Sequence, residues 1–342
     1  MSTSNSDSSE TTATNTSSTA AESTRSLKDR VGLSIHAIAG IDAPTLVDVI
    51  VQAETAGVKQ VWATQGAAST DLLTAYAAAF QRTGEIRLGT SIVPIYPRHP
   101  LALAQQAATA ASLGPGRLRL GVGTSHRPTV EGTYGIKMEE PLAYLEEYIG
   151  VLRTALWEGS VDHQGKAFTA KVKMNHPQPV PVLIAALGEK AFRLAGAKSD
   201  GAISWNVPAR HLLAVSLPAL REGAESAGRT PPPLVAHVPV VLSNDADAAR
   251  AAAKRSLSVY ARLPFYTNMW AAAGYPVEAD GLVSNDLIDN LVVMGDEAAV
   301  AARLRELLDS GLDELLLNGL LVGSREDAAD EQNRLIRFIG DF

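Results

Sequence analysis

The sequence contains no cysteine among its 342 residues. This absence excludes a disulfide scaffold, a thiolate zinc site, an iron–sulfur cluster and a cysteine nucleophile. Basic residues are also outnumbered, with 30 Lys and Arg against 37 Asp and Glu, so the formal net charge is -7. Because a nucleic-acid-binding protein usually presents a clustered basic face, we expect no nucleic-acid partner.

Apolar runs long enough to cross a bilayer are absent as well. Hydrophobic residues nevertheless make up 46% of the chain and charged residues only 20%, which is enough apolar material for a large buried core. We therefore expect a soluble protein of the cytoplasm that has no membrane partner.

The amino-terminal residues differ from the rest of the chain. Fifteen of residues 1–24 are Ser or Thr, and none of Leu, Ile, Val, Phe, Trp or Tyr occurs before Leu27. Such a segment cannot bury enough apolar surface to offset the entropy lost on ordering. The sequence thus predicts a disordered extension over residues 1–27 and a single folded domain over residues 28–342.

After Arg30 short apolar runs alternate with alanine-rich segments of helical length. The runs are continuous rather than alternating, which is typical of parallel strands covered on both faces. Eight such runs separated by helices predict a closed (β/α)₈ barrel, the TIM barrel. A doubly wound open sheet is the alternative, but no Gly-rich fingerprint follows the first run. The predicted strands are 31–35, 60–63, 86–92, 117–122, 181–185, 200–204, 234–241 and 314–317.

Two stretches are too long to be simple connections, residues 124–140 and 263–287. Long loops that follow barrel strands commonly act as lids or binding elements. We expect the first to contribute to function and leave the role of the second open.

Chemistry in such barrels is carried by residues at the carboxyl ends of the strands. These positions hold no pair of carboxylates, no His/Asp/Glu cluster at metal-ligand spacing and no Gly-x-Ser-x-Gly turn. A polar but weakly charged mouth favours a bound cofactor that brings its own reactivity, and we expect no metal. The candidate positions are His36, Gln65, 91–93, 123–126, 187–190 and Trp205.

Three segments are specific enough to interpret. Residues 87–100 contain three prolines that stiffen a wall beside the mouth, although an ordinary rigid loop explains them too. Residues 120–126 combine glycines with Thr124, Ser125 and His126; the histidine is either a proton donor or acceptor, or an ordinary surface side chain. Residues 183–192 form a strand, a glycine and a helix start, which suits a phosphate but also occurs without one.

The order of these motifs resembles the luciferase-like monooxygenase superfamily, and within it the oxidoreductases that depend on the deazaflavin coenzyme F-420 (an 8-hydroxy-5-deazaflavin). The resemblance runs from about Val31 to Gly319 and covers the following stretches: Ala56–Gly57 with Val61–Trp62, the Arg-Leu-Gly-Thr-Ser-Ile-Val-Pro stretch of residues 87–94, Arg-His-Pro at 98–100 with Leu-Ala-Gln-Gln at 103–106, 116–118 with Leu-Gly-Val-Gly at 120–123, 182–188, 194–196 and 197–205.

The resemblance implies a modified barrel with the cofactor ring at its carboxyl-terminal mouth, and a cis peptide bond between Ser91 and Ile92 behind the ring. It also implies that the cofactor phosphate lies near Gly188. The expected cofactor-binding residues are His36, Ser91, Ile92, Val93, Gly123, Thr124, Ser125, Ala186, Leu187, Gly188, Glu189 and Lys190.

Deazaflavin-dependent sugar-phosphate dehydrogenases carry an Asp-His pair where this chain has Gln65 and Gly66, and a Glu where it has His126. The resemblance therefore implies hydride transfer between coenzyme F-420 and another small organic substrate. We expect His126 and Gln65 to be catalytic, Tyr134 and Trp205 to line the substrate pocket, and the protein to be a homodimer. The alternatives are an FMN-dependent monooxygenase of the same superfamily and a flavin- or deazaflavin-binding protein without turnover.

Overall fold

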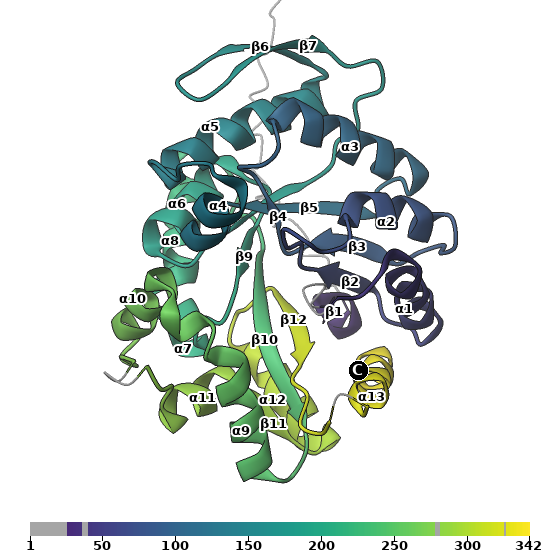
Figure 1. Cartoon of the computed structure of the whole chain (residues 1–342), viewed down its shortest axis with the longest axis vertical. Coiled ribbons are helices and arrows are strands. Elements are labelled where there is room, and N and C mark those ends of the chain that lie inside the picture. Colours follow the sequence, from purple (N-terminus) through teal and green to yellow (C-terminus); the bar gives the residue numbers. More distant parts are fainter. Residues whose placement is uncertain (1–25, 36–39, 278–280, 325) are drawn as a thin grey trace, which may run out of the picture.

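The computed structural model describes residues 26–35, 40–277, 281–324 and 326–342. Its centre is a ring of eight parallel strands in the order β1-β2-β3-β5-β8-β9-β10-β12, which closes where β12 pairs with β1 (Figure 1). This confirms the predicted barrel, and the open sheet is wrong. The strands of the ring are β1 (Val31–Ile35), β2 (Gln60–Ala63), β3 (Arg87–Thr90), β5 (Leu118–Gly123), β8 (Val182–Ala185), β9 (Ala202–Ser204), β10 (Leu234–Leu242) and β12 (Glu314–Gly319).

Apolar side chains fill the inside of the ring. Trp62, Leu183, Ile203, Val235 and Leu316 form one buried cluster there, and Ile92 packs against it. The amino-terminal end of the ring is closed by a polar group, in which Glu314 Oε2 accepts hydrogen bonds from Arg119 Nη1 (2.6 Å) and Gln60 Nε2 (3.1 Å). The barrel is therefore a packed core rather than a pore, and side chains can line open space only at its carboxyl end.

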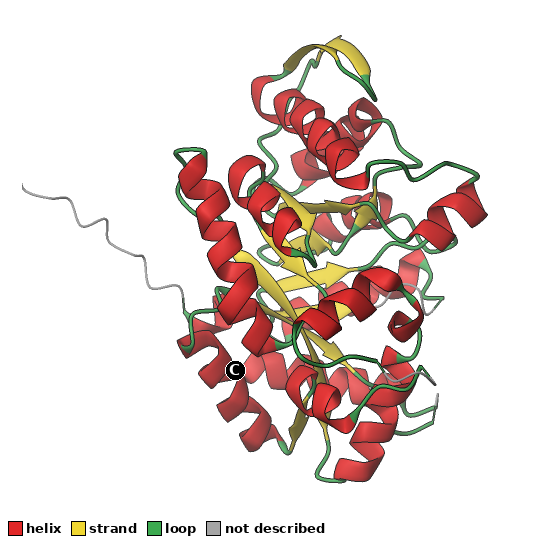
Figure 2. Ribbon diagram, turned by 90° about the vertical axis from the view of Figure 1, so that its left-hand side faces the viewer, coloured by secondary structure: helices red, strands yellow, loops and turns green. Residues whose placement is uncertain are grey.

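Helices surround the strands (Figure 2). Aspartates begin several of them, because a carboxylate can accept hydrogen bonds from the free amides of the first turn: Asp42 accepts from Thr45 N and Asp71 from Thr74 N. The covering helices are α1 (Ala43–Thr55), α2 (Leu72–Phe80), α3 (Pro100–Leu113), α5 (Pro141–Arg153), α6 (Glu189–Lys198), α8 (Leu217–Ser226), α9 (Ala246–Leu257), α12 (Glu297–Asp309) and α13 (Ala328–Asp341), with the helical turns η1 (Leu27–Arg30), η3 (Thr154–Glu158), α7 (Ala209–His211) and η4 (Leu212–Ser216).

The two long stretches are partly helical. The first contains α4 (Arg127–Tyr134). The second contains α10 (Pro264–Ala272) and the start of α11 (Asn285–Leu291), and the turn η5 (Tyr260–Arg262) precedes it. An antiparallel hairpin of β6 (Ser160–Gln164) and β7 (Thr169–Lys173) lies outside the barrel beyond α3 and α5, and β11 (Val293–Gly295) pairs with β10 (Figure 1).

The third barrel strand is interrupted just after Thr90. The peptide bond between Ser91 and Ile92 is cis, which confirms what the resemblance implied. The chain then resumes as the two-residue strand β4 (Val93–Pro94), which pairs with β5. Ser91 and Ile92 therefore lie at the mouth of the barrel.

Two further expectations from the sequence concern the domain boundary near residue 27 and the absence of a membrane-spanning segment. The boundary between an extension of residues 1–27 and a domain of residues 28–342 stays a prediction, since residues 1–25 lie outside the described part of the chain. None of the helices formed by the described residues combines the length and the hydropathy needed to span a bilayer.

Candidate active site

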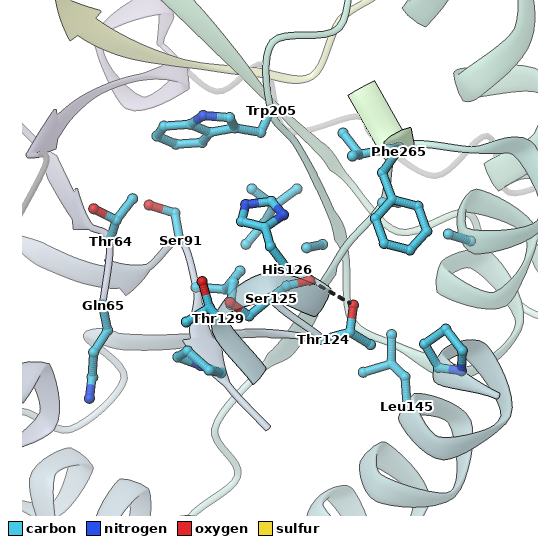
Figure 3. Close-up of a pocket in the computed structure, with 18 of the residues that line it drawn as sticks. Thr64, Gln65, Ser91, Thr124, Ser125, His126, Thr129, Leu145, Trp205 and Phe265 are labelled. Carbon is cyan, nitrogen blue, oxygen red and sulfur yellow. Dashed lines mark hydrogen bonds between the residues drawn. The ribbon is translucent and has the colours of Figure 1, made fainter. Parts of the chain in front are cut away.

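A cavity of about 790 Å³ opens at the carboxyl ends of the barrel strands (Figure 3). Its walls come from segments that follow six strands of the ring, together with α4, the start of α5, and the segment from η5 to α10. The described lining residues are Gly40, Thr64–Ser69, Ser91, Ile92, Pro94, Thr124–His126, Thr129, Pro141, Leu142, Leu145, Ala185–Ala191, Ile203, Trp205, Tyr260, Phe265 and Tyr266.

His126 follows β5 and precedes the first residue of α4. Ser125 adopts a positive φ of 59°, which turns the chain between the strand and the helix. The His126 imidazole lines the cavity and contacts the ring of Tyr266, with centroids 5.8 Å apart. Burial lowers the pKa of His126 below its ordinary value, so the imidazole is neutral at pH 7 and able to accept a proton.

The floor of the cavity carries buried hydroxyl groups. The hydroxyls of Thr64 and Ser91 make no hydrogen bond to any described residue, although both side chains are more than nine-tenths buried and both residues line the cavity. Beside them, the side chain of Ile92 rests against Gly123, where a Cβ would lie 3.1 Å from Ile92 Cγ1. Burying a hydroxyl group without a hydrogen-bond partner costs free energy, and a polar ligand could supply the missing partners. This floor is therefore suited to a polar ligand.

The amino terminus of α6 forms one edge of the cavity. Gly188 precedes the helix without a side-chain cap, so the first backbone amides of α6 have no partner within the helix. The Glu189 carboxylate is held along the helix by Arg193, with Oε1 and Nη1 2.6 Å apart, and Lys190 is exposed at the rim. Free amides, a helix dipole and a lysine together suit a phosphate.

Aromatic rings in contact form another wall of the cavity. Trp205 Nε1 donates a hydrogen bond to Tyr260 Oη at 2.9 Å, and the ring of Tyr260 meets Tyr266 edge to face with centroids 4.7 Å apart. Behind Tyr266 lies the buried Trp270. Burial raises the pKa of Tyr266 well above its ordinary value, so its hydroxyl stays neutral. The stretch of residues 263–287, whose role was left open, therefore contributes Phe265 and Tyr266 to the cavity lining.

Most residues expected at the site do line this cavity. They are Gln65, Ser91, Ile92, Thr124, Ser125, His126, Ala186, Leu187, Gly188, Glu189, Lys190 and Trp205. Their roles stay predictions. Val93 and Gly123 are buried in the pairing of β4 with β5, behind the floor, and do not line it. His36 falls among residues 36–39, outside the described residues.

The surroundings of two expected residues, Tyr134 and Gln65, bear on their predicted roles. Tyr134 is not among the described lining residues, because it lies at the last turn of α4, at the opposite end of that helix from His126. The amide of Gln65 is bound to the start of α2: Nε2 donates to Asp71 Oδ2 (3.2 Å) and Oε1 accepts from Leu72 N (3.3 Å). In Figure 3 the Gln65 side chain points away from His126.

Sequence reasoning missed the lining residues Thr64, Thr129, Leu142, Leu145, Tyr260, Phe265 and Tyr266. The sequence did contain a signal for Tyr260, Phe265 and Tyr266. Aromatic residues are only 5% of the chain, yet four of them fall between residues 260 and 270. Such a local excess in a long connection marks a candidate binding wall.

A parallel barrel whose mouth carries a polar floor, an uncapped helix start that suits a phosphate and a buried imidazole is typical of cofactor-dependent β/α-barrel enzymes. The sequence model described as luciferase-like monooxygenase matches residues 25–314. The chain belongs to the luciferase-like monooxygenase family.

One similar protein and two similar structures are described by names that include coenzyme F-420. An F-420-dependent glucose-6-phosphate dehydrogenase of Kineococcus radiotolerans is 30% identical over 294 residues, which cover 80% of this chain and 86% of the relative. The F-420-dependent tetrahydromethanopterin reductase of Methanopyrus kandleri has the same fold, with a TM-score of 0.74 at 21% identity over 91% of this chain and 97% of the reductase. An F-420-dependent secondary alcohol dehydrogenase, described in complex with an F-420–acetone adduct, has a TM-score of 0.73 at 20% identity, over 91% and 98% of the two chains.

Proposed function

We propose that this protein is an oxidoreductase that transfers a hydride between a small organic substrate and coenzyme F-420. The observation that carries the proposal is the cavity floor, where the unpartnered hydroxyls of Thr64 and Ser91 lie beside Ile92. The names of the relatives favour F-420 over FMN for such a site.

The residues present fit this cofactor. A planar ring would be held on the floor by Ile92 below and by the backbone of Thr124 and Ser125 at its side, with hydrogen bonds from Thr64 and Ser91. Its phosphate would be held by the first amides of α6 and by Lys190. When bound, coenzyme F-420 supplies a carbon, C5, that accepts or gives a hydride, and it does not activate oxygen as a flavin does.

His126 moves the proton that accompanies the hydride. In the oxidation of an alcohol, the carbon–hydrogen bond breaks with its electron pair leaving as hydride, the carbonyl forms, and the hydroxyl proton passes to the neutral imidazole. The lowered pKa of His126 suits this direction, because the group is ready to accept a proton at pH 7. The neighbouring rings of Tyr266 and Phe265 help to keep water from the imidazole.

One titration tests the proposal. The apo-protein is titrated with coenzyme F-420 and, in parallel, with FMN, and binding is followed by fluorescence quenching; oxygen uptake is then measured with each reduced cofactor. We expect tighter binding of F-420 and no oxygen uptake. Tighter binding of FMN with oxygen uptake would instead identify a monooxygenase, and F-420 binding without any substrate-dependent change in absorbance would identify a binding protein.

We propose in addition that the protein is a homodimer of the cytoplasm. This part of the proposal is supported by the family resemblance. Light scattering of the purified full-length chain measures the mass directly, and a monomer at micromolar concentration would contradict it; fractionation of the source cells tests the location.

A further inference from the structure

Charge is distributed unevenly around the cavity. Among the lining residues that the structure describes, Glu189 and Lys190 are the only members of the Asp, Glu, Lys and Arg group. Both lie at the amino terminus of α6, where the carboxylate of Glu189 is already paired with Arg193. Lys190 is thus the one described basic side chain on the lining, and it stands where the cofactor phosphate would bind.

The wall near His126 is apolar by contrast. Trp205, Tyr260, Phe265 and Tyr266 line it with rings, and Leu142 and Leu145 add aliphatic side chains. Figure 3 shows Trp205, Phe265 and Leu145 among them. Phe265 is 44% exposed, an unusual state for a large apolar side chain, and its exposed face borders the cavity. Rings of this kind bind apolar bodies by area and stacking.

A sugar phosphate would be poorly accommodated here. A phosphate dianion removed from water needs cationic or charge-assisted partners, normally Arg or Lys, and its burial without them is costly. The apolar wall offers none among its described residues. An uncharged molecule, on the other hand, would gain about 25 cal/mol for each Å² of apolar surface buried.

From these observations we propose that the substrate is an uncharged alcohol, or the matching ketone, with an apolar aromatic or alicyclic body that packs against Trp205, Tyr260, Phe265 and Tyr266. This inference rests on the proposed function, since the reacting carbon must face both the floor and His126. It separates this chain from the relatives named as glucose-6-phosphate dehydrogenases.

The first test measures binding without turnover. The apo-protein, and separately the protein with coenzyme F-420, is titrated with 1-phenylethanol, glucose and glucose 6-phosphate by calorimetry. We expect 1-phenylethanol to bind at least about a hundredfold more tightly than either sugar, because neither sugar finds its polar groups paired on this wall. Inorganic phosphate should leave 1-phenylethanol binding unchanged. Equal or tighter binding of glucose 6-phosphate, or competition by phosphate at the alcohol site, would overturn the inference.

A matched pair of variants places the binding site. Phe265→Lys puts a cation on the wall and should raise the Kd of 1-phenylethanol about tenfold. Val259→Lys adds the same charge to an exposed residue of the same segment outside the lining and should leave the Kd unchanged. Equal effects of the two variants, or none from Phe265→Lys, would show that the alcohol does not bind at this wall.

The two proposals fail in distinguishable ways. If 1-phenylethanol binds and Phe265→Lys weakens it, but coenzyme F-420 does not bind, the apolar substrate site stands and the cofactor assignment is wrong. If coenzyme F-420 binds and is reduced with glucose 6-phosphate in preference to 1-phenylethanol, the cofactor assignment stands and the substrate class is wrong.

Discussion

The indole of Trp205 stacks face to face on the imidazole of His237, with ring centroids 3.6 Å apart and planes 17° from parallel. His237 belongs to β10, and its Nδ1 accepts a hydrogen bond from the backbone N–H of Asn206 at 3.4 Å. A side chain of the barrel itself therefore fixes the plane of the indole, and Tyr260 fixes its edge. Trp205 is presented to the cavity as a rigid surface.

Loss of that surface should weaken substrate binding. Trp205→Leu removes the ring and its hydrogen bond to Tyr260, so we expect the KM of the preferred alcohol to rise about tenfold while kcat changes little. Steady-state kinetics with saturating coenzyme F-420 measure both constants. Trp157→Leu, at a half-exposed indole outside the cavity, is the control and should leave KM unchanged. An effect confined to kcat would contradict a binding role for Trp205.

His126 should set the acidic limit of activity. Because burial lowers its pKa below 6.5, the imidazole takes up a proton only at lower pH, where it can no longer accept one from substrate. The kcat/KM for alcohol oxidation is expected to be constant from pH 8 to about 6.5 and to fall at lower pH. His126→Ala should lower kcat at least about a hundredfold and abolish the fall of kcat/KM at low pH.

The binding constant of coenzyme F-420 across the same pH range is the control for the His126 experiment, since it separates proton transfer from cofactor binding. An unchanged pH profile with unchanged turnover in His126→Ala would exclude the assigned role.

Gln65 is expected to stabilise the protein rather than to catalyse. Its amide joins the end of β2 to the first turn of α2, so Gln65→Ala should lower the free energy of unfolding by about 1–2 kcal/mol and change kcat by less than about threefold. Chemical denaturation and turnover decide between the roles, with the exposed Gln105→Ala on α3 as the control. A large loss of kcat at full stability would support the catalytic role predicted from the sequence.

Gly121 is needed because two strands approach closely. A Cβ at this position would lie 2.0 Å from the backbone oxygen of Thr90 and 2.5 Å from Ile203 Cδ1. Gly121→Ala must therefore displace β3 next to Ser91, and we expect a loss of more than about 2 kcal/mol in the free energy of unfolding together with weaker cofactor binding. Gly84→Ala, where a Cβ meets nothing within 4 Å, should have neither effect. Thermal unfolding of the two variants compares them directly.

The start of α6 should bind the cofactor tail by charge. Lys190→Ala is expected to raise the Kd of coenzyme F-420 about tenfold at low salt and by less in 1 M salt, where such interactions are screened. Lys198→Ala removes the same charge from the other end of the helix and serves as the control. Equal Kd values for the two variants would place the phosphate elsewhere.

The sequence predicted the barrel strands well because parallel strands buried on both faces leave continuous apolar runs; β1 and β2 have the predicted bounds. The β6–β7 hairpin was missed, since exposed residues such as Lys171 and Lys173 leave no such run. The polar half of the site follows strand ends and could be predicted. Of its aromatic half, Trp205 was predicted and the cluster after residue 260 left a signal, but the contact between Trp205 and Tyr260 joins residues 55 positions apart and no local pattern encodes it.

The packed interior of the barrel has a kinetic consequence. Since Trp62, Leu183, Ile203, Val235 and Leu316 fill the axis below Ile92, nothing can enter or leave through the amino-terminal end. A cofactor and a substrate bound in this cavity would therefore share one route in and out through the carboxyl-terminal mouth, and the exchange of either would depend on whether the other is present.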